Sequence, residues 1–447
     1  MFCFILLVEI GAKVVGLVWD YENYDANSVY SYVISYDQYT GDNEILEILY
    51  GPVSKDTYHA IQVENSTSDA ILARYRFNRT LVWAISIEDR IARDSTSISP
   101  DEEYLFYIIY ISSVTGPLIF PQINWSDGSV IRVNNISNYY WNKAYWDSTF
   151  GTSSDVIYFS TGSISTSFGA IIKYNITDNS ATILEMSTIR YLRTIELLAQ
   201  SRLYTISRLV GDNYAFAAAW VDFDSNSSIW SKNINRPEDN NTAYIQSALN
   251  DDKSIIFHLS YSEQKIIYTK LNATTGDSIG SFYTFDNIWR EVFEAIFYNP
   301  FLIFSVRNGN PTYYIWVINT TDDNFIYSYE ADSNVRLYHA TINPNNGLLN
   351  IAGSKFSTRK VYYAQAPLSR LSLISEISDA NLSYAIATNF NITDIAISVS
   401  PVYISSIDNT SLSSPATLEF SIEENNTLGP SFNFDDFNIS VVENLSK

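Results

Sequence analysis

The sequence predicts an all-β fold, a single β-propeller of seven or eight four-stranded antiparallel blades, from three observations. Short runs rich in Ile, Val, Tyr, Phe and Thr are broken by Asn, Asp, Ser and Gly about every 8–12 residues, as strands and turns are. Long helical periodicity is nearly absent, and residues 190–201, the best helical candidate, also fit a pair of strands. A turn motif recurs with a period of about 40–50 residues, which is the length of a propeller blade.

Two consecutive units can be followed strand by strand. Each has an inner strand, two middle strands and an outer strand. The strands of these two units are expected at 244–249, 254–259, 265–271 and 279–284, and then at 292–297, 301–306, 313–318 and 325–329.

The turn motif places Asp or Asn after the last apolar residue of a strand, and its fullest copies are 36–41 and 271–276. Asp and Asn bond their own backbone two residues on, and Gly permits a positive φ, so the motif predicts a hairpin. The copies are anchored at positions 37, 112, 175, 224, 272, 319, 365 and 408. They count eight hairpins, but the wide first intervals and the irregular last unit leave seven blades open.

These copies resemble the outer hairpin of quinoprotein-like (PQQ-type) and YVTN-type β-propeller repeats, in which a strand ends in Asp-x-x-Thr-Gly. The resemblance covers a few residues in each unit and implies a propeller hairpin without implying an activity. The tryptophan expected later in a quinoprotein repeat is mostly replaced, by Phe282 in one copy and by residues 46–49 in another. We therefore expect no quinone, and no cofactor besides N-linked glycans.

The propeller is expected to span residues 1–425, with residues 426–447 as a C-terminal strand or tail. An open ring leaves bare strand edges, so a terminal strand usually completes the last blade. Residues 431–442 are a candidate for this strand; alternatively they pair with a neighbouring molecule and give a polymer. At the other end, residues 1–12 are either a signal peptide or the first strand.

The composition limits the class of partner. A net charge of -22 disfavours nucleic acids and anionic membranes, and no run reaches the ~18 apolar residues of a membrane helix. Charged residues make up 17%, against about 25% in average proteins, so Asn, Ser and Thr must supply much of the polar surface. Cys3 is the only cysteine, which excludes an intrachain disulfide.

Glycosylation is the strongest functional signal. There are 15 Asn-x-Ser/Thr sequons, against about 8 expected by chance. They lie at Asn65, Asn78, Asn124, Asn135, Asn175, Asn226, Asn240, Asn272, Asn319, Asn381, Asn391, Asn409, Asn425, Asn438 and Asn444. We expect four of them at the turn between the two outer strands of a unit, namely Asn175, Asn272, Asn319 and Asn409. Three are expected in connections between units, on the opposite face: Asn124, Asn240 and Asn381.

No catalytic or metal site is predicted. His59, His258 and His339 are far apart in the sequence and are expected on strand surfaces. The triplet Asp222, Asp224 and Asn226 is spaced like the start of a calcium loop, but the later Gly and Glu are missing. The Asp-Asp pairs at 251–252, 322–323 and 435–436 are expected in turns, and no nucleophile elbow, phosphate loop or dinucleotide fingerprint is present.

Together these features favour a secreted or cell-surface glycoprotein with a structural or adhesive role, such as a coat or filament subunit that associates with itself. The alternative is a ligand-binding propeller, a receptor ectodomain or a lectin, that uses its central funnel. An enzyme is not expected; it would need convergent acids or a cofactor at the central axis, and the side chains of the inner strands decide this.

Overall fold

The computed structural model describes residues 30–409 with short gaps. The gaps are 35–42, 64–68, 77–80, 88–89, 111–117, 137–138, 141–146, 164–168, 188, 200, 210–214, 236–241, 263–264, 281–282, 287–288, 309–311, 345–346, 357–359, 375, 382–383, 387–390, 395 and 405–407.

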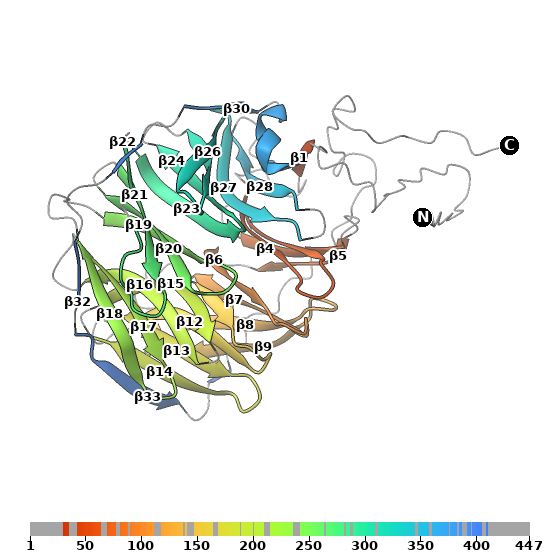
Figure 1. Ribbon diagram of the computed structural model, residues 1–447. Helices are drawn as coiled ribbons and strands as arrows, with labels where there is room; N and C mark the ends of the chain where they lie inside the picture. The colour runs from red at the N-terminus through yellow and green to blue at the C-terminus, as the bar shows by residue number, and fades with distance from the viewer. Residues whose placement is uncertain are drawn as a thin grey trace, which may run out of the picture.

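Seven antiparallel sheets follow one another around a common centre and form the blades of a propeller (Figure 1). Blade 1 contains β2 (Asn43–Tyr50), β3 (Thr57–Val63), β4 (Asp69–Tyr75) and β5 (Leu81–Ile87). Blade 2 contains β6 (Arg90–Ile98), β7 (Tyr104–Tyr110), β8 (Leu118–Asn124) and β9 (Val130–Ile136). In blade 3, β10 (Tyr139–Tyr140) and β11 (Ser148–Phe150) both pair with β12 (Val156–Ser163), which is followed by β13 (Gly169–Asn175) and β14 (Ser180–Met186).

The next blades repeat the same antiparallel order. Blade 4 contains β15 (Ile189–Ala199), β16 (Arg202–Leu209), β17 (Ala215–Asp222) and β18 (Ser227–Asn235). Blade 5 contains β19 (Thr242–Leu249), β20 (Ile255–Ser262), β21 (Lys265–Asn272) and β22 (Tyr283–Asp286). Blade 6 contains β23 (Trp289–Tyr298), β24 (Phe301–Asn308), β25 (Tyr313–Asn319) and β26 (Asn324–Ala331). The two units predicted strand by strand are blades 5 and 6, although the outer strand of blade 5 is Tyr283–Asp286 rather than 279–284. The stretch with helical character is strand β15.

The N-terminal part of the chain closes the ring. Blade 7 contains β27 (Val335–Ile342), β28 (Leu349–Lys355) and β29 (Lys360–Ala366), and its outer strand is β1 (Tyr30–Ile34), antiparallel to β29. The sequence analysis expected a terminal strand at residues 431–442, and a signal peptide or the first strand at residues 1–12. Both ranges lie outside the described residues.

Of the two predicted blade numbers, seven is confirmed. The count of eight arose because the anchor at position 408 is not a blade hairpin but part of a later segment, strand β34. Position 112 lies between β7 and β8 rather than at an outer hairpin, and the copy at 36–41 lies outside the described residues.

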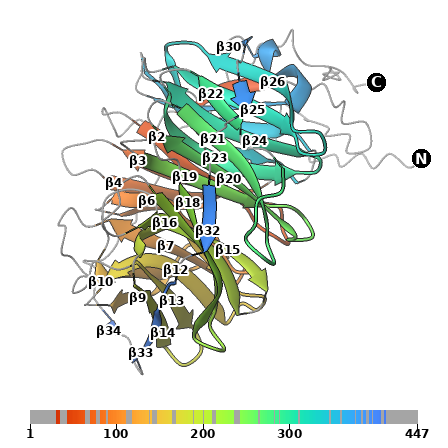
Figure 2. The ribbon, with the colours of Figure 1, turned by 60° about the vertical axis from the view of Figure 1, so that its left-hand side comes forward.

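After blade 7 the chain passes through the short helix η1 (Leu368–Leu373) and returns around the outside of the ring in reverse order. It adds a further outer strand to five of the seven blades, which the sequence analysis did not predict. These strands, here called the belt, are β30 (Ile377–Asp379) on β26, β31 (Tyr384–Ile386) on β22, β32 (Asn391–Asp394) on β18, β33 (Val399–Ile404) on β14 and β34 (Asp408–Asn409) on β9. The belt strands lie along the outer margin in blue (Figure 1), and β32 lies beside β18 on the near side in Figure 2.

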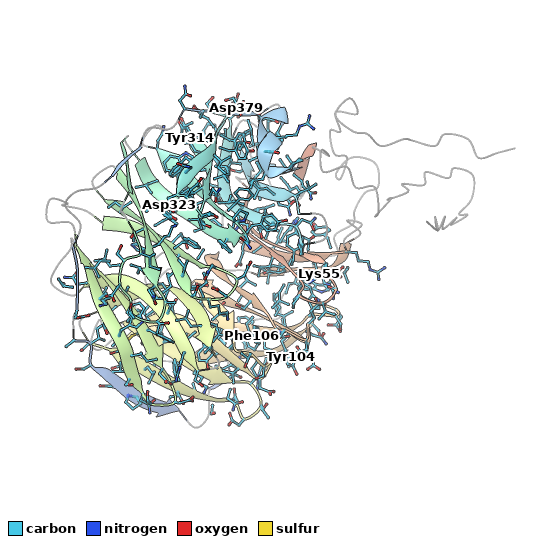
Figure 3. The ribbon with its side chains drawn as sticks, in the orientation of Figure 1. Lys55, Tyr104, Phe106, Tyr314, Asp323 and Asp379 are labelled. Carbon is cyan, nitrogen blue, oxygen red and sulfur yellow. The ribbon has the colours of Figure 1, made fainter. Side chains whose placement is uncertain are left out.

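The hydrophobic core lies between neighbouring blades. Between blades 2 and 3, for example, Phe106 packs within 6.4 Å of Phe120 and Phe159, measured between ring centroids, and within 6.1 Å of Tyr174. Phe106 lies inside the molecule, whereas Asp379 of the belt lies at its margin (Figure 3). Each fully buried side chain of this size contributes about 1.5–3 kcal/mol. Trp125 and Trp316 are the largest of the fully buried side chains among the described residues.

Candidate functional site

The inner strands of three neighbouring blades carry ionisable side chains at equivalent places. The pairing with the second strand shifts register between Val292 and Glu294 in β23, between Leu337 and His339 in β27, and between Ile45 and Glu47 in β2. A β-bulge inserts one residue and re-aims the side chain that follows. Because the inner strands of blades 6, 7 and 1 contact one another in that order, Glu294, His339 and Glu47 come together near the centre of the ring.

His339 of blade 7 connects blade 6, which carries Glu294, with blade 1, which carries Glu47. Its Nδ1 is 2.9 Å from Oε2 of Glu294, and its Nε2 is 2.9 Å from the backbone oxygen of Ile48 in β2. When Nε2 donates its proton to that carbonyl, the contact with Glu294 needs a further proton, either on Nδ1 or on the carboxyl group. Both side chains of this contact are largely shielded from solvent, with exposed fractions of 5% for His339 and 18% for Glu294.

Glu47 is the most perturbed acid of the cluster. Its side chain is buried, and burial raises the pKa of its carboxyl group from 4.5 to about 7, although a hydrogen bond with Thr96 in β6 opposes the shift. His339 also lowers this pKa, whereas Glu294 raises it further. Glu47 consequently titrates near neutral pH, which is a property of acid–base groups in functional sites as well as of buried structural acids.

Polar contacts extend this cluster to further blades. Gln246 of β19 donates through Nε2 to the backbone oxygen of Phe293, at 2.9 Å, and Ser97 of β6 donates through Oγ to the backbone oxygen of Ser148 in β11, at 2.8 Å. Together with the three ionisable residues, these contacts connect the inner strands of blades 5, 6, 7, 1, 2 and 3. We call this set (Gln246, Glu294, His339, Glu47, Thr96, Ser97 and Ser148) the inner polar chain.

The predicted surface position of the three histidines is wrong. His59, His258 and His339 are all buried, with exposed fractions of 3%, 0% and 4%. Burial lowers the pKa of His59 and of His258 to about 3, so both are neutral at physiological pH. The meeting of Glu47, Glu294 and His339 at the centre was not predicted from the sequence. Strand alternation failed at these three residues because each bulge reverses the inside–outside pattern by one residue.

Metal ligation is a separate question from the presence of ionisable groups. In the described ranges, no three His, Cys, Asp or Glu side chains are grouped so that they could hold a metal ion. The triplet that resembles a calcium loop serves a turn: Oδ1 of Asp222 accepts from the backbone N–H of Asp224 at 2.8 Å, and Oδ2 lies 3.2 Å from Nε of Arg202. The pairs 251–252 and 322–323 lie in turns, as predicted, and 435–436 lies outside the described residues.

Four sequons occupy the same place in four blades. Asn124, Asn175, Asn272 and Asn319 each end the third strand of a blade. In each turn Oδ1 of the asparagine accepts from the backbone N–H two residues on, at 2.9, 3.0, 2.8 and 2.9 Å respectively. The residue four positions after the asparagine has a positive φ in every case, which Gly, Asn and Asp tolerate best. These residues are Gly128, Asn179, Gly276 and Asp323.

The middle residue of each sequon is turned towards the preceding blade. The side chains of Trp125, Ile176 and Ala273 are buried there. Their backbone oxygens accept hydrogen bonds from that blade: Trp125 from Arg74 and Trp83, Ile176 from Arg132, Ala273 from Trp230, and likewise Thr320 from Lys270. The asparagine and the middle residue of a sequon are neighbours in the chain, and their side chains point in different directions. Because the middle residue points into the molecule, the asparagine lies at the outer edge of the turn.

The predicted positions of Asn175, Asn272 and Asn319 are confirmed, but three others are corrected. Asn124 lies in the outer hairpin rather than in a connection between blades, because the connection is further along the chain. Asn381 is exposed on the belt, between β30 and β31, and Asn409 is in belt strand β34 rather than in a hairpin.

The remaining sequons fall in three groups. Asn135 lies within strand β9, where its Oδ1 is buried, and Asn391 belongs to β32. Asn226 closes the outer turn of blade 4 with φ 52°. Six lie outside the described residues: Asn65, Asn78, Asn240, Asn425, Asn438 and Asn444.

Comparison with known proteins identifies the fold only. No protein-family model and no curated protein matches the chain. The structure of the Dos1 propeller is similar with 10% identity and a TM-score of 0.50, over 76% of this chain and 94% of that one. A chain of the mitotic checkpoint complex has 12% identity and a TM-score of 0.49, over 82% and 98% of the two chains. At such identities the similarity to the Dos1 propeller establishes a β-propeller and carries no information on activity.

None of the helices in the described ranges combines the length and the apolar character of a transmembrane helix.

Proposed function

We propose that this protein is an extracellular or cell-surface glycoprotein with a structural or adhesive role, which associates with itself or with other proteins in a coat or filament. The observation that carries the proposal is the repetition of one sequon geometry in four blades, at Asn124, Asn175, Asn272 and Asn319. The turn is held by Oδ1 of each asparagine, so a glycan on Nδ2 is compatible with the hydrogen bond that forms the turn.

Glycans would also account for the unusual surface. The chain has only 17% charged residues, and sugars at one hairpin turn after another would supply the missing polar surface. The same sugars restrict the area open to a partner, which favours contacts through strand edges or through the glycan-free parts of the faces.

The test is site-resolved glycopeptide mass spectrometry on protein secreted by a eukaryotic cell. We expect occupied sites at Asn124, Asn175, Asn272, Asn319 and Asn381, and a bare Asn135, since its Oδ1 is buried within a strand. The matched control is Asn272→Asp, which abolishes the sequon and keeps the turn acceptor, as Asp222 does in blade 4. Bare asparagines at all four hairpins would overturn the extracellular assignment.

Self-association is tested separately, by light scattering over a range of concentrations. The proposal expects multimers in material with native glycans, and a strictly monomeric protein at high concentration would contradict the structural role.

A second candidate function is ligand binding at the centre of the ring, favoured by the cluster of Glu47, Glu294 and His339. Partial exposure of the Glu294 side chain, 18%, leaves one carboxylate within reach of a small polar ligand. Saturable binding on glycan or peptide arrays, lost in Glu294→Gln, would support this function. Binding that is unchanged in Glu294→Gln would place the ligand elsewhere.

A further inference from the structure

Blade 1, which has four strands and no belt strand among the described residues, is the next blade along the course of the belt. The belt strands follow blades 6, 5, 4, 3 and 2 in that order, so blade 1 is the next neighbour. Among the described residues, the outer strand of blade 1, β5, pairs only with β4. An outer strand of this kind presents a row of backbone donors and acceptors to any further strand.

The spacing of the belt predicts where its next strand begins. The five belt strands start at Ile377, Tyr384, Asn391, Val399 and Asp408, so successive starts are 7, 7, 8 and 9 residues apart. The chain continues to residue 447, and a step of the same size from Asp408 leads to residues 415–417.

The sequence at that place has the pattern of a strand. Residues 416–422 read Ala-Thr-Leu-Glu-Phe-Ser-Ile, in which apolar residues alternate with polar ones. Strict alternation over this length indicates a strand with one buried face, here formed by Leu418, Phe420 and Ile422.

The register of the existing belt gives independent support. In blades 6, 4 and 3 the last residue of the outer strand lies opposite the first residue of the belt strand, as for Met186 and Val399. The same rule places Ile87 of β5 opposite Ala416. Leu418 then faces Ile85, and Phe420 faces Trp83.

In this register, apolar residues of the segment lie opposite apolar residues of β5. Ile85 and Trp83 are buried, with exposed fractions of 7% and 6%, and they belong to the core between blades 1 and 2. Cross-strand pairs of apolar and aromatic residues on one face stabilise a sheet. The spacing of the belt and the side-chain pattern therefore select the same register.

We propose that the edge of β5 binds residues 416–422 of the same chain, as a sixth belt strand antiparallel to β5. The belt would then hold six consecutive blades from outside, while β1 closes the remaining blade from the other end of the chain. The chain would thus fasten its own ring from both ends.

Disulfide trapping in the full chain tests this register. The single native cysteine is replaced by Cys3→Ser, and Ala84→Cys is combined with Glu419→Cys, the residue that the register places opposite it. Directly opposed residues in antiparallel strands have Cα atoms about 4.5–5.5 Å apart, which a disulfide can span. The matched control combines Ala84→Cys with Glu424→Cys, five residues beyond the predicted partner on the same segment.

Under mild oxidation we expect an intramolecular cross-link in most of the Ala84→Cys/Glu419→Cys protein, and at least tenfold less in the control. Peptide mass spectrometry identifies the bond, and non-reducing electrophoresis shows whether it lies within one chain. Equal yields in the two variants would overturn the proposed strand. Efficient heterodimer formation on mixing the two single-cysteine proteins, without the intramolecular bond, would assign the edge to a second copy and overturn the same-chain occupant.

Discussion

The inner and outer ends of the blades are held together by different chemistry. At the inner end, neighbours are joined through side chains, as where His339 contacts Glu294 on one side and the backbone oxygen of Ile48 on the other. At the outer end, the belt joins its blades through antiparallel backbone pairing, and its side chains are often exposed, as for Asp379 and Val402.

This difference teaches which part of the molecule depends on residue identity. A backbone ladder forms with almost any side chain, and an edge strand accepts even proline, as at Pro401 of β33, so the belt should tolerate substitution. The inner polar chain depends on particular donors, acceptors and protons in a buried place, where a lost partner leaves an unsatisfied charge. Substitutions and pH should therefore act far more strongly at the inner end than at the belt.

The largest effect is expected from His339→Leu. This change leaves Glu294 without its imidazole partner and the backbone oxygen of Ile48 without its donor. Each buried polar group that loses its partner costs about 1–3 kcal/mol, and two groups lose theirs here, so we expect a loss of roughly 2–6 kcal/mol in the free energy of unfolding from urea titrations.

The matched control at the outer part of blade 7 is Lys355→Met, which removes a more exposed ion pair with Glu376. We expect a cost below about 1 kcal/mol for it. Equal losses in the two variants would contradict the contrast between the inner and outer ends.

The second effect is a pH dependence that comes from Glu47. Because burial raises its pKa from 4.5 to about 7, the native state binds this proton more tightly than the unfolded chain does. The resulting stabilisation is complete below pH 4.5 and is lost as the pH rises to about 7. At about 1.4 kcal/mol per pKa unit, the loss amounts to roughly 3 kcal/mol.

Two histidines act in the opposite direction and must be separated from Glu47. The pKa of His59 and that of His258 are lowered from 6.5 to about 3, so their contribution is present above pH 6.5 and is lost as the pH falls. The difference in unfolding free energy between Glu47→Gln and the unmodified protein isolates Glu47, since the histidines are common to both. We expect this difference to grow in favour of the variant between pH 4.5 and 7; parallel curves would rule out the raised pKa.

A smaller effect is expected from the one belt residue that reaches the core of blades 6 and 7. Ile377 of β30 is 4% exposed and packs with that cluster. Ile377→Val should cost about 0.5–1.5 kcal/mol in unfolding free energy. Asp379→Ala, two residues on in the same strand, serves as the control and should leave the melting temperature unchanged; a drop equal to that of Ile377→Val would show that polar belt side chains also bear on stability.

The smallest effect is expected from Asp394→Ala in belt strand β32. Asp394 is 85% exposed and lies 2.7 Å from Nζ of Lys232, which also contacts Asp277 at 2.8 Å. Since one partner of the lysine remains and the removed one is screened by solvent, calorimetry should show no change in Tm. A clear decrease would mean that side chains, rather than backbone pairing, attach the belt.

The outer hairpins of blades 3 to 6 could be predicted because their signals are local. Asn272 and Gly276 form a turn through their own backbone, so the motif reads directly as a hairpin. The belt could not be predicted, since strands of only a few residues, such as β34, have too little alternation to stand out from loops. The buried place of His339 was missed because a bulge before it changes which face its side chain occupies.

The sequence by itself determined the elements whose cause lies within a few neighbouring residues: the strands of blades 5 and 6, the Asx turns, and the repetition that makes a propeller. Only the tertiary structure decided that there are seven blades, that β1 closes the ring beside β29, and that the chain returns around five of them. Only the tertiary structure likewise brings Glu294, His339 and Glu47 together. These outcomes depend on backbone pairing and side-chain contacts between segments far apart in the sequence, and such pairings leave no local pattern because the hydrogen-bonding groups of every strand are alike.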